Sequence, residues 1–201
     1  MHEQQALEDI RLIRDMLERT RRATAESGAL FIFWGIWLVL GLAGHYALYF
    51  LHRFSWIWAN WAFFGLTGWV ISAVYSIRRG RKAQMRTYAQ SATAFVSIAC
   101  SIAFVLAAFV FPLLGIYSYE AIPVIIALIS GIMQFIQGGL FRWPLLWAAG
   151  ILWWVGAAAM AFVPASGRGL VLIPLMIFGY LVPGLIFRAR FRRDGGDRAA
   201  E

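Results

Sequence analysis

Long apolar runs separated by short polar segments make up the chain between residues 29 and 187. Most of these runs hold about 20 residues, the number with which a helix crosses a hydrocarbon core of about 30 Å. The pattern therefore predicts an all-α polytopic membrane protein with six transmembrane helices in three hairpins. The expected spans are residues 29–51, 55–77, 92–115, 121–141, 144–163 and 170–187.

A different pattern occupies residues 1–28, which we predict to form an amphipathic cytoplasmic helix. Ile10, Ile13 and Leu17 follow the alternating spacing of three and four residues that is typical of a coiled-coil seam. Charged residues cover the other side of this helix. One interpretation places the helix on the bundle or on the membrane surface. The other makes residues 3–26 a binding segment for a partner protein or a second copy of the chain.

The distribution of Lys and Arg predicts how the chain is oriented. Sixteen of the 18 basic residues precede the first span, follow an even-numbered span or lie in the tail, and only two fall on the alternate side. The positive-inside rule then places both termini in the cytoplasm. Residues 188–201 are expected to form a basic, disordered cytoplasmic tail.

Composition supports the bilayer as the main solvent of the chain. Of its 201 residues, 61% are hydrophobic and 14% are charged, which is more apolar side chain than a soluble domain of this size can bury. The net charge is +8, but the basic residues flank apolar spans, so nucleic acid is not an expected partner. The N-terminus lacks the early apolar region of a cleavable signal peptide, so the first span is expected to act as an uncleaved anchor.

Three polar side chains form a stripe on the fourth span. Ser130, Gln134 and Gln137 are spaced by four and three residues, which places them on one helical face. They can form hydrogen bonds between helices, or they can line a pathway for a small solute. No Asp or Glu lies deep in any span. Because a proton-coupled carrier usually uses a buried carboxylate as a relay, this argues against such a carrier.

A second polar set, His45, His52 and Glu120, is expected towards the outer face. Imidazole and carboxylate groups can bind metals or carry acid–base chemistry, but no known motif spacing joins these three residues. The single cysteine, Cys100, excludes an intrachain disulfide. We therefore predict no catalytic residues, no resident metal and no cofactor, and keep a membrane enzyme acting on lipid as an alternative.

Several short motifs resemble a group of uncharacterised bacterial six-span membrane proteins. They are the pattern of Asp9 to Leu17, Phe33-Trp34-Gly35, and the segments 137–145 and 179–184. Members of this group often accompany PadR-like transcription regulators, so the resemblance implies an accessory membrane protein. Its motifs are structural and identify no functional residue.

Together these features predict a non-enzymatic integral protein of the bacterial inner membrane, with an accessory or regulatory role and a partner- or self-binding N-terminal helix. The first alternative is a channel or small-solute transporter that uses the stripe on the fourth span. The second is the membrane enzyme acting on lipid.

Overall fold

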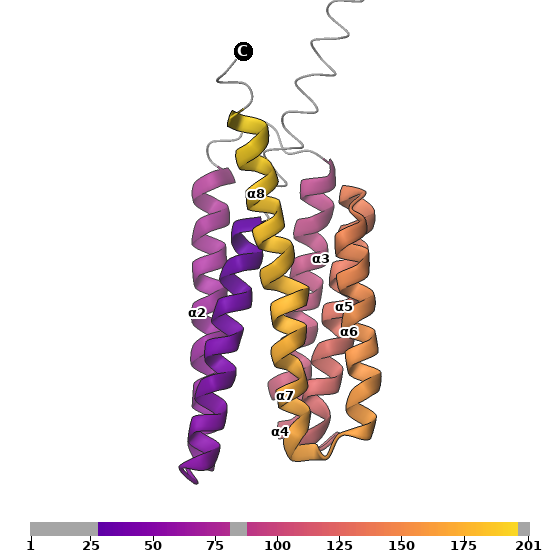
Figure 1. Cartoon of the computed structure of the whole chain (residues 1–201). Helices are drawn as coiled ribbons and strands as arrows, with labels where there is room; N and C mark the ends of the chain where they lie inside the picture. The colour runs from indigo at the N-terminus through magenta and orange to yellow at the C-terminus, as the bar shows by residue number, and fades with distance from the viewer. Residues whose placement is uncertain (1–27, 81–87, 197–201) are drawn as a thin grey trace, which may run out of the picture.

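The computed structural model describes residues 28–80 and 88–196, and the side chains of residues 28–78 and 91–189. Helices make up nearly all of this part of the chain, and it contains no strand (Figure 1). Six of the helical stretches are long and apolar enough to cross a membrane. The predicted all-α fold with six spans is therefore confirmed. The predicted N-terminal helix, with Ile10, Ile13 and Leu17, lies outside the described residues.

Successive spans run in opposite directions along the bundle, and α3 packs mainly on α5 (Figure 1). A first helix, Gly28–Phe50, is joined by a tight turn to α2. The remaining bounds are α2 Phe54–Gly80, α3 Tyr88–Val105, η1 Leu106–Val110, α4 Phe111–Leu113, η2 Tyr119–Ala121, α5 Ile122–Phe141, α6 Pro144–Ala159, η3 Met160–Phe162, α7 Ala165–Met176, η4 Ile177–Leu181 and α8 Val182–Gly196.

Two predicted boundaries are wrong. The sixth span was expected to begin at residue 170, but α7 begins at Ala165, directly after Pro164, which stands at its N-cap. The tail was expected to be disordered from residue 188, but α8 continues as a helix to Gly196. A run rich in Arg has good helix propensity, so the helix extends beyond its apolar segment.

The core lies among α5, α6 and the α7–η4–α8 helix. Its fully buried side chains include Leu146, Trp153 and Met160 of the fifth span and Met176 of the sixth. Glycines bring α5 and α6 close together: a Cβ added to Gly150 would lie 2.9 Å from the backbone nitrogen of Phe135. Close backbone approach of this kind is typical of helix pairs in membranes, where dispersion replaces the hydrophobic effect between helices.

The first helix packs along the sixth span, so the two ends of the bundle sequence lie side by side (Figure 1). A Cβ added to Gly184 would lie 2.9 Å from the backbone nitrogen of Ile32, and one added to Gly28 would lie 2.8 Å from the Cβ of Phe187. At the other end, the Tyr46 hydroxyl donates to the backbone carbonyl of Ser166. In contrast, α2 packs on the first helix and leaves much of its apolar surface exposed.

Two segments of π-helix, η1 and η4, each end shortly before a proline. Pro112 follows η1 and Pro183 follows η4. Proline has no N–H and its ring collides with the carbonyl four residues earlier, and the wider π turn relieves that collision. In η1, the freed carbonyl of Ala107 accepts a hydrogen bond from the Tyr117 hydroxyl.

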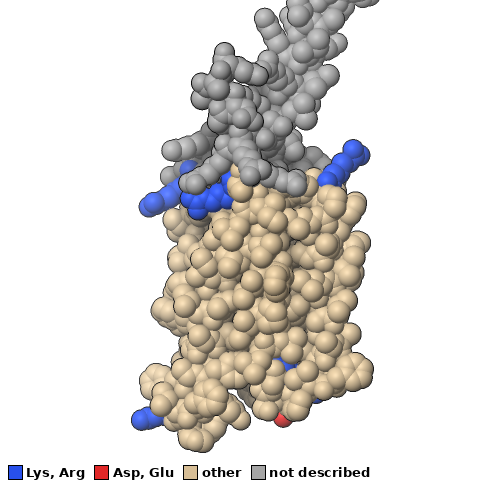
Figure 2. All heavy atoms as spheres, in the orientation of Figure 1, with Lys and Arg blue, Asp and Glu red and all other residues tan. Residues whose placement is uncertain are grey.

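Basic side chains gather at the end of the bundle that holds the C-terminal part of α8, and the flank seen in Figure 2 is almost free of charge. Arg78, Arg142 and Arg188 are exposed at this end, which we call the basic end. The opposite end holds Glu120 and Arg168. The apolar flank between the two ends matches the surface of a multi-pass membrane protein.

Candidate functional site

The polar stripe of α5 faces the interior of the bundle. Ser130, Gln134 and Gln137 are buried, together with the small residues Ala127, Gly131 and Gly138 on the same face. The apolar side chains of Ile132 and Ile136 point outward and are exposed. This is the reverse of an amphipathic helix in water, and it is the arrangement expected when lipid is the solvent.

A tyrosine from the sixth span meets this stripe. Tyr180 is buried, and its hydroxyl lies beside the side chains of Ser130 and Gln134. Cys100 of α3 also lies close enough to Tyr180 for the two groups to interact electrostatically. The indole of Trp153, from α6, packs edge-on against the Tyr180 ring with 5.7 Å between ring centroids. Four elements thus contribute to one cluster, which we call the core cluster: Cys100, Ser130, Gln134, Trp153 and Tyr180.

Two members of the core cluster have buried polar atoms without a hydrogen-bond partner. Both the Oε1 and Nε2 atoms of Gln134 are unpaired although the residue is 0% exposed, and Nε1 of Trp153 is unpaired as well. The Tyr180 hydroxyl stands beside the amide of Gln134 without forming an aligned bond to it. An unpaired buried amide costs about 1–3 kcal/mol, so such groups call for an explanation.

Three other indole N–H groups in the bundle, those of Trp37, Trp61 and Trp154, donate hydrogen bonds. Trp37 donates to the carbonyl of Phe64 at 2.9 Å, and Trp154 donates to the carbonyl of Leu128 at 3.3 Å. In the first hairpin, Asn60 donates to the carbonyl of Gly41 at 2.9 Å. These bonds join neighbouring helices.

His45, His52 and Glu120, the predicted outer set, each have separate partners. His45 accepts a hydrogen bond from Trp61 at 3.1 Å through Nδ1, and this bond joins the first helix to α2. His52 occupies the turn after the first helix with a φ of 55° and lies edge-on to Phe54. The backbone carbonyl of Glu120 accepts a hydrogen bond from Arg168. Within residues 28–80 and 88–196, no three His, Cys, Asp or Glu side chains converge on a point that could hold a metal ion.

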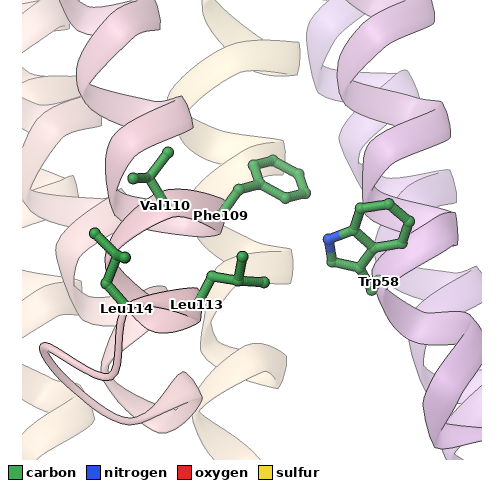
Figure 3. A pocket seen from close by; sticks show the side chains of 5 residues that line it. All are labelled: Trp58, Phe109, Val110, Leu113 and Leu114. Carbon is green, nitrogen blue, oxygen red and sulfur yellow. The ribbon is translucent and has the colours of Figure 1, made fainter.

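An apolar pocket of about 340 Å³ lies between α2 and the end of the third span (Figure 3). The indole of Trp58 forms one wall, and the other wall consists of side chains from η1, α4 and the following turn: Phe109, Val110, Leu113 and Leu114. None of these side chains titrates or carries a nucleophile. The lining offers no acid–base chemistry, and it suits a hydrocarbon chain.

The first helix reaches the core cluster through one aromatic side chain. Phe31 is buried, and its ring centroid lies 5.6 Å from that of Tyr180 and 5.8 Å from that of Phe187. Phe187 in turn stacks on Trp143, at the turn between α5 and α6, with 3.5 Å between centroids. The beginning of the first span is therefore connected by aromatic contacts to the centre of the bundle.

Sequence reasoning identified the stripe on α5 but not its partners on other helices. Tyr180 and Trp153 each carry a single polar atom on an apolar ring, so they do not stand out in an apolar span. Tyr and Trp side chains favour the membrane interface. A phenol and an indole far from the ends of a span are therefore unusual, and this position was the signal that could have identified them. Neither family models, curated proteins nor solved structures match this chain.

Proposed function

We propose that the protein is a non-enzymatic accessory or regulatory component of a bacterial inner membrane, whose N-terminal segment binds a partner protein or a second copy. Both termini lie in the cytoplasm in this proposal, in accord with the positive-inside rule. The heptad spacing of Ile10, Ile13 and Leu17 supports a binding segment, and the bilayer surrounds the six spans.

The contact of Phe31 with Tyr180 is the observation that carries the regulatory part of the proposal. Residues 1–27 precede the first helix in the sequence, and Phe31 lies in the first turn of that helix. A partner that pulls or rotates the segment would therefore move Phe31 against η4. Because packed side chains do not deform continuously, a small shift there would be passed to the core cluster as a change of packing.

Deletion of residues 1–25 tests the binding segment. The full chain should co-purify with a partner or show an oligomer by native mass spectrometry, and the shortened chain should lose that species. A bundle that keeps the same partner and oligomeric state without residues 1–25 would refute the proposal.

The variant Phe31→Ala tests the regulatory contact, with Phe33→Ala as the matched control. Phe33 stacks on Trp37 of its own helix and does not belong to the Phe31–Tyr180–Phe187 contacts. Phe31→Ala should keep the bound partner but abolish the change in hydrogen exchange that the partner causes at residues 177–181. An unchanged exchange response in Phe31→Ala would show that the signal does not pass through Phe31.

A second candidate function is passage of a small solute through the bundle. The observation that favours it is the unpaired amide of Gln134, a polar group in the membrane interior that could bind a solute. A Gln134→Cys variant in a Cys100→Ala background should react with a small neutral thiol reagent in membranes. Absence of labelling under native conditions, with full labelling after unfolding, would exclude a water-accessible pathway.

A further inference from the structure

The core cluster has unpaired hydrogen-bonding groups of both kinds. Gln134 offers an acceptor at Oε1 and a donor at Nε2, and Trp153 offers a donor at Nε1. The Tyr180 hydroxyl lies beside the side chains of Ser130 and Gln134, and the hydroxyls of Ser130 and Tyr180 can each donate or accept. A ligand that pairs with this set must itself both donate and accept hydrogen bonds.

The cluster contains no group that would neutralise an ionic ligand. Its members are an alcohol, an amide, an indole, a phenol and a thiol, and none of them is an Asp, Glu, Lys, Arg or His side chain. A charged molecule at this place would remain unpaired in a medium of low dielectric constant, at a large cost. The chemistry therefore selects an uncharged molecule.

A glycine lets the backbone of η4 lie close to the Trp153 side chain. Gly179 of η4 faces the Trp153 indole, and a Cβ added there would lie 2.3 Å from Nε1. The segment η4 is a π-helix between Pro174 and Pro183, where the α-helical hydrogen-bond ladder is interrupted. Segments of this kind are common at functional sites, and they are places where a helix bends.

We propose that Gln134, Trp153 and Tyr180 form the binding site for one small uncharged solute with both donor and acceptor groups, such as a primary amide or a polyol. The solute enters when η4 moves away from α5 and α6, and it pairs with the amide of Gln134 and the indole N–H of Trp153. This inference deepens the second candidate function, and it rests on that candidate only for the route by which the solute reaches the core.

Binding is measured by thermal unfolding of the purified full chain in detergent, with acetamide and glycerol as neutral probes and acetate and methylammonium as charged controls. Acetamide or glycerol should raise Tm in a saturable way, because a ligand that binds only the folded state stabilises it. The charged controls should leave Tm unchanged.

Two variants of the site and one control assign the effect. Gln134→Leu removes both unpaired amide atoms at similar volume, and Trp153→Phe removes the indole N–H but keeps an aromatic ring. Each variant should raise the probe concentration needed for half-saturation by about tenfold or more, since each removes at least one hydrogen bond to the solute. The control is Ser72→Ala, which removes another unpaired buried hydroxyl, on α2, outside the core cluster. It should bind the probes as the wild type does.

The outcomes separate the binding site from the pathway. A saturable shift that both site variants lose, with no solute flux into proteoliposomes, would support the site and reject the pathway. No saturable shift with either neutral probe would overturn the proposal. The proposal would also be overturned if neither probe changed the Tm of the wild type while the wild type was more stable than Gln134→Leu. Buried water alone would then satisfy Gln134.

Discussion

Glycine 179 shows how one missing side chain shapes the core. Its hydrogen atom faces the Trp153 indole, where any larger group would collide with Nε1. Gly65 is also helical, but a Cβ added to it would meet no atom within 4 Å. The sequence presents both residues as glycines within apolar spans, and only the packing of α6 on η4 distinguishes them.

Replacing Gly179 by Ala should therefore lower the free energy of unfolding by about 1–3 kcal/mol, because the indole must leave its rotamer or the helices must separate. The matched change Gly65→Ala should leave stability unchanged or raise it by up to about 1 kcal/mol, since Ala is the better helix former. Chemical unfolding in mixed micelles measures both. Equal effects of the two changes would contradict the packing of Trp153 on Gly179.

Arg142 ends α5 in a left-handed conformation, with φ 51° and ψ 47°. Its N–H caps the helix through the carbonyls of Gly138 and Gly139. For residues other than glycine, this conformation costs about 1–2 kcal/mol of conformational free energy. In the sequence, Arg142 is one of the basic residues that follow an even-numbered span, and nothing there indicates the strained backbone.

The variant Arg142→Gly should consequently be about 1 kcal/mol more stable than Arg142→Ala, because only glycine adopts this conformation without strain. Both variants lose the charge, so their difference isolates the backbone. Unfolding midpoints in the same detergent provide the comparison. If Arg142→Ala were the more stable of the two, the left-handed cap would be disproved.

At the scale of elements, hydrophobic periodicity located the six spans to within a few residues, except at the start of α7 and the end of α8. It could not locate η1 and η4, because a π turn changes the backbone register without changing composition. The sequence shows prolines at positions 112 and 183. What could not be predicted is which carbonyl each proline frees and which side chain satisfies it.

The turn after α4 depends on such a pairing. Tyr117 lies between two spans and donates to the carbonyl of Ala107 in η1. Desolvation raises the pKa of the Tyr117 phenol above its ordinary value of 10.0. Because the folded state favours the protonated phenol, this contribution to stability is present below pH 10 and is lost as the pH rises through the raised pKa.

We expect the stability of the wild type to fall more steeply above pH 10 than that of Tyr117→Phe, which has no proton to lose at this position. At pH 8 the variant should be less stable by about 0.5–1.5 kcal/mol, the usual contribution of one hydrogen bond. Measuring the free energy of unfolding of both proteins from pH 8 to 11 shows whether the two stability curves converge at high pH. Parallel curves would indicate that the Tyr117 phenol does not couple to folding.

At the scale of the whole molecule, the sequence predicted the number of spans and the inward-facing stripe on α5, but not the neighbours of each helix. The packing of the first helix on the sixth span depends on contacts between residues at least 120 positions apart, such as Tyr46 with Ser166 and Phe31 with Tyr180. Apolar spans of similar composition carry little information about such pairings. The core cluster could therefore be recognised only in part, through Ser130, Gln134 and Gln137.

Placing single cysteines at the two ends of the bundle tests the six-span account and its orientation most directly. In a Cys100→Ala background, Ser118→Cys and Ser166→Cys mark the end that holds Glu120 and Arg168, where both serines are exposed. Lys82→Cys marks the basic segment that follows α2 in the sequence. In intact cells, a membrane-impermeant thiol reagent should label positions 118 and 166 and should label position 82 only after permeabilisation. Labelling of position 82 together with 118 in intact cells would contradict the account.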